Sequence, residues 1–131
     1  MKLSIIIPVF NEEKTLPELI CRINAVNLEL EKEIIFIDDR STDKSRDLLR
    51  EYEKNGYKAI FLAKNMGKGA AIRKGFEAAT GDLVLVQDAD LEYNPKDYHV
   101  LLQPILDGDA DVVYGSRFIT VFPRRVLYFT H

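Results

Sequence analysis

Apolar residues gather in five short runs along the chain, and polar segments separate these runs. Apolar runs rich in β-branched residues are typical of strands that are buried on both faces of a parallel sheet. The first run ends at Pro8, which has no N–H to donate to a neighbouring strand, so we expect that strand to end there. The predicted strands cover residues 3–7, 33–38, 58–62, 83–87 and 111–114.

Between these runs, apolar residues recur at the spacing of a helix. Thr15 and Glu18 have the spacing of a capping box, which predicts a helix that begins after Thr15. Asn55-Gly56 and Gly81 predict the ends of the next two helices, and Asn94-Pro95 predicts the start of a fourth. The predicted helices cover residues 16–26, 44–54, 71–79 and 95–106. Alternating strands and helices predict an α/β fold, a three-layer arrangement in which a mainly parallel sheet carries helices on both faces.

Composition narrows the class of protein. With 131 residues, 47% of them hydrophobic, the chain is expected to form one domain with a real core. The net charge of −3 argues against a dedicated nucleic-acid binder. Met1-Lys2 leads straight into the first predicted strand and no run of 18 apolar residues occurs, so we predict neither a signal peptide nor a membrane span. We expect a cytoplasmic chain, or one that lies peripherally at the cytoplasmic face of a membrane.

The chain has one cysteine, Cys21, which excludes an internal disulfide and fits a reducing compartment. Cys21 lies among the apolar residues of the first predicted helix. We therefore expect it to be a small core residue and not a nucleophile.

Three acidic residues follow the fourth predicted strand at alternate positions: Asp88, Asp90 and Glu92. In an extended chain this spacing places all three side chains on one face. Open parallel sheets bind their ligands at the carboxyl ends of the strands, and carboxylates there suit a cation bound to phosphate groups. The stretch therefore predicts a metal and phosphate site.

A second acidic cluster, Asp107 to Asp111, has the spacing that begins a calcium-binding loop. Such a loop requires Gly at its sixth position and Glu at its twelfth, where this chain has Val112 and Phe118. We interpret this cluster as a solvated turn between a helix and a strand.

A glycine-rich turn, Asn65 to Gly69, precedes the third predicted helix. It is not a phosphate-binding loop of the GxxxxGK[ST] kind, because Gly69 follows Lys68 and Leu62 stands at the first glycine position. Two interpretations stay open. The amides and Lys64 or Lys68 attract an anion at the helix N-terminus, or the glycines serve a tight turn and close helix packing.

Acids also end the second predicted strand, at Asp38 and Asp39, and Asp43 lies in the turn that follows. Helix capping and turn chemistry are the alternative to a ligand-binding role for these residues. Of the three, Asp43 is the one for which this alternative is strongest.

Four segments at predicted strand ends occur in a characteristic order: Pro8 to Glu12, Asp38 to Asp43, Asp88 to Glu92, and Gly115 to Phe118. Together they resemble the nucleotide-sugar domain of the family 2 inverting glycosyltransferases. The glycine-rich turn and Gly81-Asp82 are most similar to the polyprenyl-phosphate sugar transferases of the dolichyl-phosphate mannose synthase type.

This resemblance implies a GT-A fold and a metal-dependent enzyme that uses Mg²⁺ or Mn²⁺. The donor would be a nucleotide-diphosphate sugar and the acceptor a polyprenyl phosphate. Transfer would be a single in-line displacement at the anomeric carbon, with inversion.

The resemblance also implies roles for individual residues. The residues implied for the nucleoside are Pro8, Phe10 and Glu12, and those for the base are Ile37 and Asp39. The residues implied for the ribose and diphosphate are Asp88 and Ala89, with Arg117 as a nearby cation. The implied metal ligands are Asp90 and Glu92, with Asp88 as a further candidate, and Asp90 also belongs to the nucleotide-sugar site.

Members of this family continue well beyond the Gly115 to Phe118 segment, whereas this chain ends 13 residues after it. We therefore expect residues 1–131 to form one nucleotide-sugar-binding domain that is incomplete at its C-terminus. One alternative is a non-catalytic fragment that binds nucleotide and metal. Another is a nucleotidyltransferase, which should carry a glycine-rich signature where this chain has Pro8 to Glu13.

The last residues, 118–131, are rich in aromatic and aliphatic side chains, and no closing element is predicted there. An exposed apolar patch usually marks an interface. Arg124 and Arg125 beside aromatic residues would suit anionic lipid head groups. We expect this segment to mediate self-association or contact with anionic membranes, the alternative being that it folds back onto the sheet.

Overall fold

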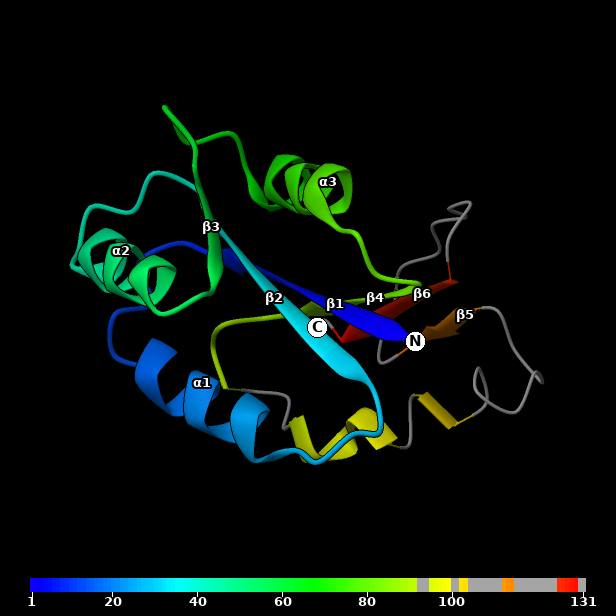
Figure 1. Ribbon diagram of the computed structural model, residues 1–131. Coiled ribbons are helices and arrows are strands. Elements are labelled where there is room, and N and C mark those ends of the chain that lie inside the picture. The colour runs from blue at the N-terminus through cyan, green and yellow to red at the C-terminus, as the bar shows by residue number, and fades with distance from the viewer. Residues whose placement is uncertain (92–94, 100–101, 104–111, 115–124, 130–131) are drawn as a thin grey trace.

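The computed structural model describes residues 1–91, 95–99, 102–103, 112–114 and 125–129, and it shows a sheet flanked by helices (Figure 1). The strands are β1 (Lys2–Val9), β2 (Glu31–Asp38), β3 (Lys58–Phe61), β4 (Leu83–Gln87), β5 (Val112–Tyr114) and β6 (Arg125–Phe129). The helices are α1 (Leu16–Ala25), α2 (Ser45–Lys54), α3 (Lys68–Ala78) and the short 3-10 helix η1 (Pro95–Asp97). No helix in the described part of the chain has the length and apolar character needed to cross a membrane.

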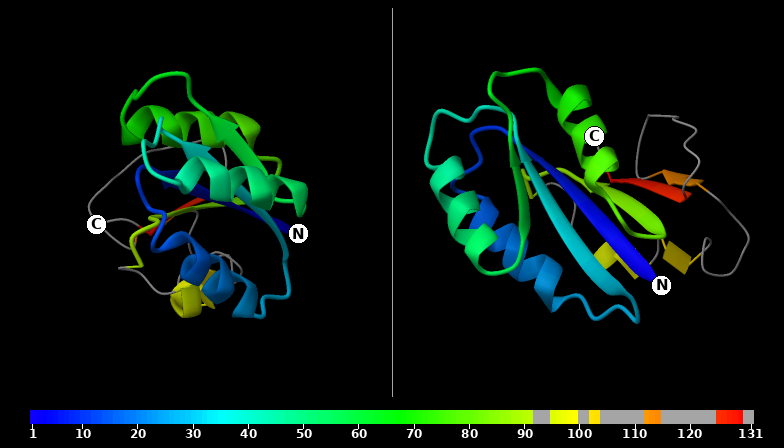
Figure 2. Two further views of the ribbon diagram at one scale, coloured as in Figure 1. Left: turned by 90° about the vertical axis from the view of Figure 1, so that its left-hand side faces the viewer. Right: turned by 45° about the horizontal axis from the view of Figure 1, so that its top comes forward.

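The six strands follow the order β3-β2-β1-β4-β6-β5, and all the pairings between them are parallel. Figures 1 and 2 show α1 on one side of the sheet and α3 on the other. The predicted three-layer α/β fold is confirmed. The five predicted strands are all present, with ends that differ from the predicted ones by at most two residues.

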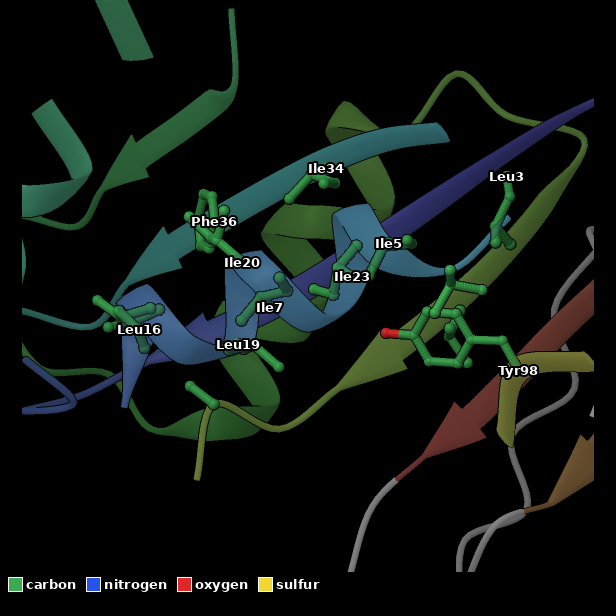
Figure 3. Close-up of a cluster of buried hydrophobic side chains, with 14 of the residues drawn as sticks. Leu3, Ile5, Ile7, Leu16, Leu19, Ile20, Ile23, Ile34, Phe36 and Tyr98 are labelled. Carbon is green, nitrogen blue, oxygen red and sulfur yellow. The ribbon is translucent and has the colours of Figure 1, made fainter. Parts of the chain in front are cut away.

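Alternate residues of the central strands face two hydrophobic clusters. Ile5 and Ile7 of β1 pack with buried side chains of α1 and α2, whereas Ile6 packs with α3 on the opposite face. Leu19 and Ile23 of α1 point into the first cluster (Figure 3). Both faces of the strands are therefore buried, as their continuous apolar runs predict.

The segment after η1 closes one end of the first cluster. Residues 98–99 and 102–103 are helical, and Tyr98 and Leu102 are buried, as the apolar stripe of the fourth predicted helix indicates. The Tyr98 hydroxyl donates a 2.7 Å hydrogen bond to Oε1 of Gln87, the last residue of β4. Burial raises the pKa of this phenol, so it stays a neutral donor. The bond ties the helical segment to the strand that leads into the acidic turn.

Strand β6 corrects the expectation that nothing closes the chain after residue 119. It lies between β4 and β5 and pairs with both. Four consecutive apolar residues, Val126 to Phe129, suit a central strand, but their partners lie far away in the sequence and no local pattern indicates them. The alternative, that the segment folds back onto the sheet, is confirmed for Arg125–Phe129. Residues 118–124 and 130–131 lie outside the described part, as does the whole Asp107 to Asp111 cluster.

Pro8 does not end β1, contrary to the prediction, and the strand continues to Val9. The Asp39 N–H donates to the Val9 carbonyl at 2.9 Å, so the polar groups of Val9 face β2. Those of Pro8 face the opposite side, where pairing with β4 stops at Ile6. The missing N–H of Pro8 therefore interrupts no hydrogen bonds between strands. A sheet tolerates proline at such a position.

Cys21 is exposed on α1, so the prediction that it is a core residue is wrong. The buried residues of α1 are Leu16, Leu19, Ile20 and Ile23. Each helical residue turns the side chain by about 100°, and Cys21, one position after Ile20, lies beyond the edge of this buried stripe.

Two glycines allow close contact between elements. A Cβ on Gly75 of α3 would lie 2.4 Å from Cγ2 of Ile6, and a Cβ on Gly81 would lie 2.6 Å from Oγ of Ser4. Both distances are too short for a real side chain, so these positions require glycine for packing. Gly81 therefore serves the contact with β1, because α3 already ends at Ala78.

Glu33 is a buried charged residue at the end of the sheet where β1 and β2 begin. Its carboxylate accepts hydrogen bonds from the Ser4 hydroxyl (2.8 Å), the Thr80 amide (2.9 Å) and Lys58 Nζ (2.6 Å). Burial raises the pKa, but the hydrogen bonds from Lys58, Thr80 and Ser4 outweigh it and lower the pKa of Glu33 from 4.5 to about 2. The ionised form is therefore favoured in the folded chain.

We expect Glu33→Gln to lower the free energy of unfolding by about 2 kcal/mol at pH 7. A carboxyl whose pKa is depressed on folding stabilises the fold above its unfolded pKa, and this contribution is lost as the pH falls. The difference between wild type and variant should therefore shrink as the pH falls from 4.5 towards 2. Urea unfolding across this range measures it. The control is Glu31→Gln, because Glu31 is exposed on the same strand. If Glu33→Gln lowers the free energy of unfolding equally at all pH values, the prediction is contradicted.

Candidate functional site

A cleft of about 360 Å³ opens at the edge of the sheet where β1, β2 and β4 end. From β1 the chain adds β2 and β3 on one side of the sheet, and then β4 on the other side of β1. Such a reversal of strand order leaves a crevice at the carboxyl ends of the strands, where α/β proteins bind ligands. The cleft is lined by Pro8, Val9, Phe10, Glu12, Asp39, Asn65, Lys68, Ala71, Asp88, Ala89 and Asp90.

The loop after β1 is held in shape by Asn11, which has a positive φ of 53°. The Oδ1 atom of Asn11 accepts hydrogen bonds from the amides of Thr42 (2.8 Å) and Asp43 (3.3 Å) in the loop after β2. Asn tolerates this left-handed conformation better than most residues. The contact fixes the loop that carries Phe10 and Glu12, and it leaves the Phe10 ring 48% exposed at the cleft.

Thr15 connects this loop to the turn after β4. Its hydroxyl donates a 2.6 Å hydrogen bond to the Ala89 carbonyl, and it lies 2.9 Å from Oε2 of Glu12. Thr15 makes no side-chain cap at the start of α1, so the predicted capping box with Glu18 is wrong. The Thr15 hydroxyl instead lies toward the Ala89 carbonyl and the Glu12 carboxylate.

The acidic turn itself differs from the prediction of one extended face. Strand β4 ends at Gln87, residues 89–90 form a turn, and Leu91 has a positive φ of 66°. Asp88 is therefore buried while Asp90 is exposed. Both still line the cleft, because the turn brings them to the same opening.

Asp39 holds the glycine-rich turn against the end of β2. Its Oδ1 accepts the Met66 amide at 2.7 Å, its Oδ2 accepts the Gly67 amide at 3.0 Å, and its backbone carbonyl accepts the Asn65 side-chain amide at 3.2 Å. Gly67 has φ +92°, which requires glycine. The tight-turn interpretation is therefore supported at Gly67, whereas neither Gly67 nor Gly69 makes a close packing contact. The amides of Met66 and Gly67, just before α3, are already bonded to the chain's own Asp39.

Lys68, the first residue of α3, reaches across the cleft to the residue that follows β4. Its Nζ forms an ion pair with Oδ1 of Asp88. The Lys68 side chain is 48% exposed, whereas that of Asp88 is 10% exposed. Asp88 thus lies at the wall of the cleft, and the ammonium group of Lys68 lies at its opening.

The other acids after β2 serve structure. Asp43 accepts hydrogen bonds from the amides of Ser45 (2.8 Å) and Glu13 (3.2 Å). Burial raises the pKa of its carboxyl, but hydrogen bonding with the Ser45 side chain and with these amides outweighs burial and lowers it. Asp38 is fully buried, and its Oδ2 lies 3.1 Å from Nε of Arg46. The structural alternative is therefore supported for Asp43 and Asp38.

The structure brings together most of the residues that the resemblance implied. The residues that line the cleft are Pro8, Phe10, Glu12, Asp39, Asp88, Ala89 and Asp90. Ile37 does not line it, because its side chain is fully buried in the cluster under α3. Glu92 and Arg117 lie outside the described residues. Sequence reasoning did not assign Val9, Asn65 or Ala71 to the site, although Val9 lies in the Pro8 to Glu12 segment and Asn65 in the glycine-rich turn.

A divalent cation suits the acids of this cleft. Carboxylates are the hard oxygen donors that Mg²⁺ prefers, and Mg²⁺ usually takes only one or two of them together with phosphate oxygens and water. Asp88 and Asp90 supply two carboxylates to one opening. Among the described residues there is no group of three His, Cys, Asp or Glu side chains gathered for a metal. The described donors therefore fit a cation shared with a phosphate ligand better than one held by protein alone.

Among known proteins, this chain is 43% identical to an undecaprenyl-phosphate 4-deoxy-4-formamido-L-arabinose transferase of Pseudomonas aeruginosa over 119 residues, which cover 87% of this chain and 35% of that relative. It is 38% identical to a dolichol-phosphate mannosyltransferase of Pyrococcus furiosus, with 91% of this chain and 34% of that relative covered. The chain therefore spans about a third of the length of these curated relatives.

Solved structures share the fold. S. aureus TarS 1-349 in complex with UDP matches with a TM-score of 0.72 and 25% identity, over 92% of this chain and 38% of that one. Glucosyl-3-phosphoglycerate synthase from Mycobacterium tuberculosis, in complex with Mn²⁺, UDP and phosphoglyceric acid, matches with a TM-score of 0.67 and 26% identity, over 86% and 43% of the two chains. Residues 4–126 match the sequence family described as glycosyl transferase family 2. Because this match spans most of the sequence, the chain belongs to glycosyl transferase family 2.

Proposed function

We propose that this chain binds a nucleotide-diphosphate sugar in the cleft and forms the donor-binding part of an enzyme that transfers the sugar to a polyprenyl phosphate. The cleft carries this proposal, since it joins an exposed aromatic ring, Phe10, to the acids Asp39, Asp88 and Asp90 at the reversal point of a parallel sheet. The acceptor class is supported by the relatives, whose names specify undecaprenyl phosphate and dolichol phosphate.

Each cleft residue has a chemical part in this proposal. The exposed face of Phe10 offers a surface for the base, because aromatic rings stack readily on flat π-systems. Asp39, 5% exposed and lining the cleft, accepts a hydrogen bond from a ring N–H of the base. Glu12 and Ala89 lie between the loops after β1 and β4, where the ribose and diphosphate would pass.

Asp88 and Asp90 would hold Mg²⁺ or Mn²⁺ together with the donor, and Glu92 is proposed as a further ligand. When bound, such a cation neutralises the charge that develops on a diphosphate leaving group. The use of a divalent cation is supported by the Mycobacterium structure, which was solved in complex with Mn²⁺ and UDP. A phosphate acceptor is already anionic, so inversion by a single displacement requires no strong general base.

A polyprenyl acceptor has a lipid tail that lies in a membrane. The whole enzyme would therefore work at the cytoplasmic face of a membrane, where a water-soluble donor and a lipid-linked acceptor meet. Because the acceptor's phosphate would lie at the level of the lipid head groups, the donor cleft would need to open towards that region.

The test is calorimetry of the chain with UDP and GDP, each with Mn²⁺ and with excess chelator. We expect one nucleoside diphosphate to bind in Mn²⁺ and its affinity to fall at least about tenfold in chelator, because the acids of the cleft repel an uncompensated diphosphate. Equal affinity in both conditions, or no binding of either nucleotide, would overturn the proposal. Sugar transfer to added polyprenyl phosphate by this chain would exclude the second candidate function, a nucleotide- and metal-binding fragment that does not catalyse transfer.

A further inference from the structure

The glycine-rich turn places one lysine, Lys68, at a fixed point on the rim of the cleft. The two amides just before it, those of Met66 and Gly67, are held by the carboxylate of Asp39 at 2.7 and 3.0 Å. The backbone of Lys68 then enters α3 directly. The start of the Lys68 side chain is therefore anchored to the end of β2, while its long aliphatic stem stays free to swing.

The ammonium group of Lys68 pairs with an acid that a cation would use. Its Nζ contacts Oδ1 of Asp88, and Asp90 lines the same cleft. Among the described residues that line this cleft, Lys68 is the one cation, and Glu12, Asp39, Asp88 and Asp90 are acids. Lys68 thus compensates Asp88 at the place where we propose that a divalent cation binds.

The exposure of the pair favours exchange over a permanent contact. Asp88 is fixed at the wall with its side chain 10% exposed, but Lys68 is 48% exposed. A half-exposed ion pair is weak, and a lysine is a mobile point charge on a flexible stem. A divalent cation at Asp88 would displace the ammonium group easily, and the nearest new anion would be the diphosphate of the donor.

We propose that Lys68 is a donor-binding residue that occupies Asp88 in the empty cleft and moves to the donor's diphosphate when Mg²⁺ or Mn²⁺ takes its place. The inference rests on the proposed function. It gives Lys68 opposite effects on two ligands, because the lysine competes with the metal but assists the nucleotide. A lysine that serves only to hold the fold would not separate the two affinities in this way.

The test compares wild type with Lys68→Met, with two measurements by calorimetry. For Mn²⁺ alone, we expect Lys68→Met to bind about fivefold more tightly, since the competing ammonium is gone. For UDP or GDP at saturating Mn²⁺, we expect binding at least about tenfold weaker, since a charge-assisted contact to phosphate is lost. Lys68→Arg should keep most of the nucleotide affinity. Lys64→Met, an exposed lysine of the same loop that does not line the cleft, should change neither value.

The outcomes separate this inference from the proposed function. If wild type binds Mn²⁺ and nucleotide and Lys68→Met changes neither affinity, the role of Lys68 is overturned while the proposed function stands. If Lys68→Met binds both Mn²⁺ and nucleotide more weakly, with an unchanged melting temperature, the proposed movement of Lys68 from Asp88 to the diphosphate is also overturned. If wild type binds no nucleoside diphosphate with Mn²⁺, the proposed function fails, and the donor-binding role of Lys68 fails with it.

Discussion

Asp90→Asn is expected to weaken the binding of UDP or GDP in the presence of Mn²⁺ by at least about 100-fold, because a ligand of the bridging cation is lost. Asp90 lines the cleft and is exposed, so the fold does not depend on burying its side chain. Asn keeps the shape and one oxygen but removes the negative charge that balances a divalent cation. Calorimetry in Mn²⁺, with thermal melting to confirm the fold, measures the effect.

The control for this change is Asp47→Asn, which removes the same charge from an exposed position on α2. We expect nucleotide affinity to stay the same in that variant. In excess chelator the Asp90→Asn chain should bind nucleotide no more weakly than wild type, because without the metal the Asp90 carboxylate only repels the diphosphate. An Asp90→Asn chain that retains wild-type affinity in Mn²⁺ would exclude a metal bridge at this residue.

Much of the fold could be predicted because the apolar pattern determines which backbone segments are buried. Continuous runs such as Ile5 to Ile7 become strands with both faces covered, and polar segments between helices and strands become loops. Acids at strand ends could also be placed near one another, since parallel strands all end at the same edge of the sheet. Pro8, Asp39 and Asp88 meet in one cleft for this reason.

The hydrogen bonds that the sequence did not predict have one cause in common: the two partners lie far apart in the sequence. Thr15 bonds Ala89, 74 positions away, instead of capping its own helix. Asp39 bonds the amide of Met66, 27 positions away. Hydrogen-bonding capacity can be read from a residue type, but the choice between a local and a distant partner depends on the assembled fold.

The packing of side chains and strands was also predicted incompletely, for a related reason. The resemblance implied that Ile37 contacts the base, yet its side chain is fully buried in the hydrophobic cluster that packs against α3. Strand β6 lies between β4 and β5, and no local sequence pattern indicates that position. The sequence therefore predicted most of the helices and strands, but not the contacts between them.

Asp39→Ala is expected to have two separate effects. The amides of Met66 and Gly67 lose their acceptor, so the free energy of unfolding should fall by about 1 to 3 kcal/mol. The base of the nucleotide loses a hydrogen-bond partner, so nucleoside affinity should fall by about 1 to 3 kcal/mol as well. Mn²⁺ affinity in the absence of nucleotide should survive, because Asp88 and Asp90 belong to a different strand end.

Both effects can arise from one carboxylate because each of its oxygens has two lone pairs. One lone pair on each oxygen faces the glycine-rich turn, which leaves the others for the base. Asp43→Ala is the matched control, since Asp43 also accepts two backbone amides but does not line the cleft. It should lose stability and keep nucleoside affinity, as measured by urea unfolding and by calorimetry with the nucleoside. If Asp39→Ala behaves in the same way as Asp43→Ala, Asp39 serves the turn alone and the base is recognised by other residues.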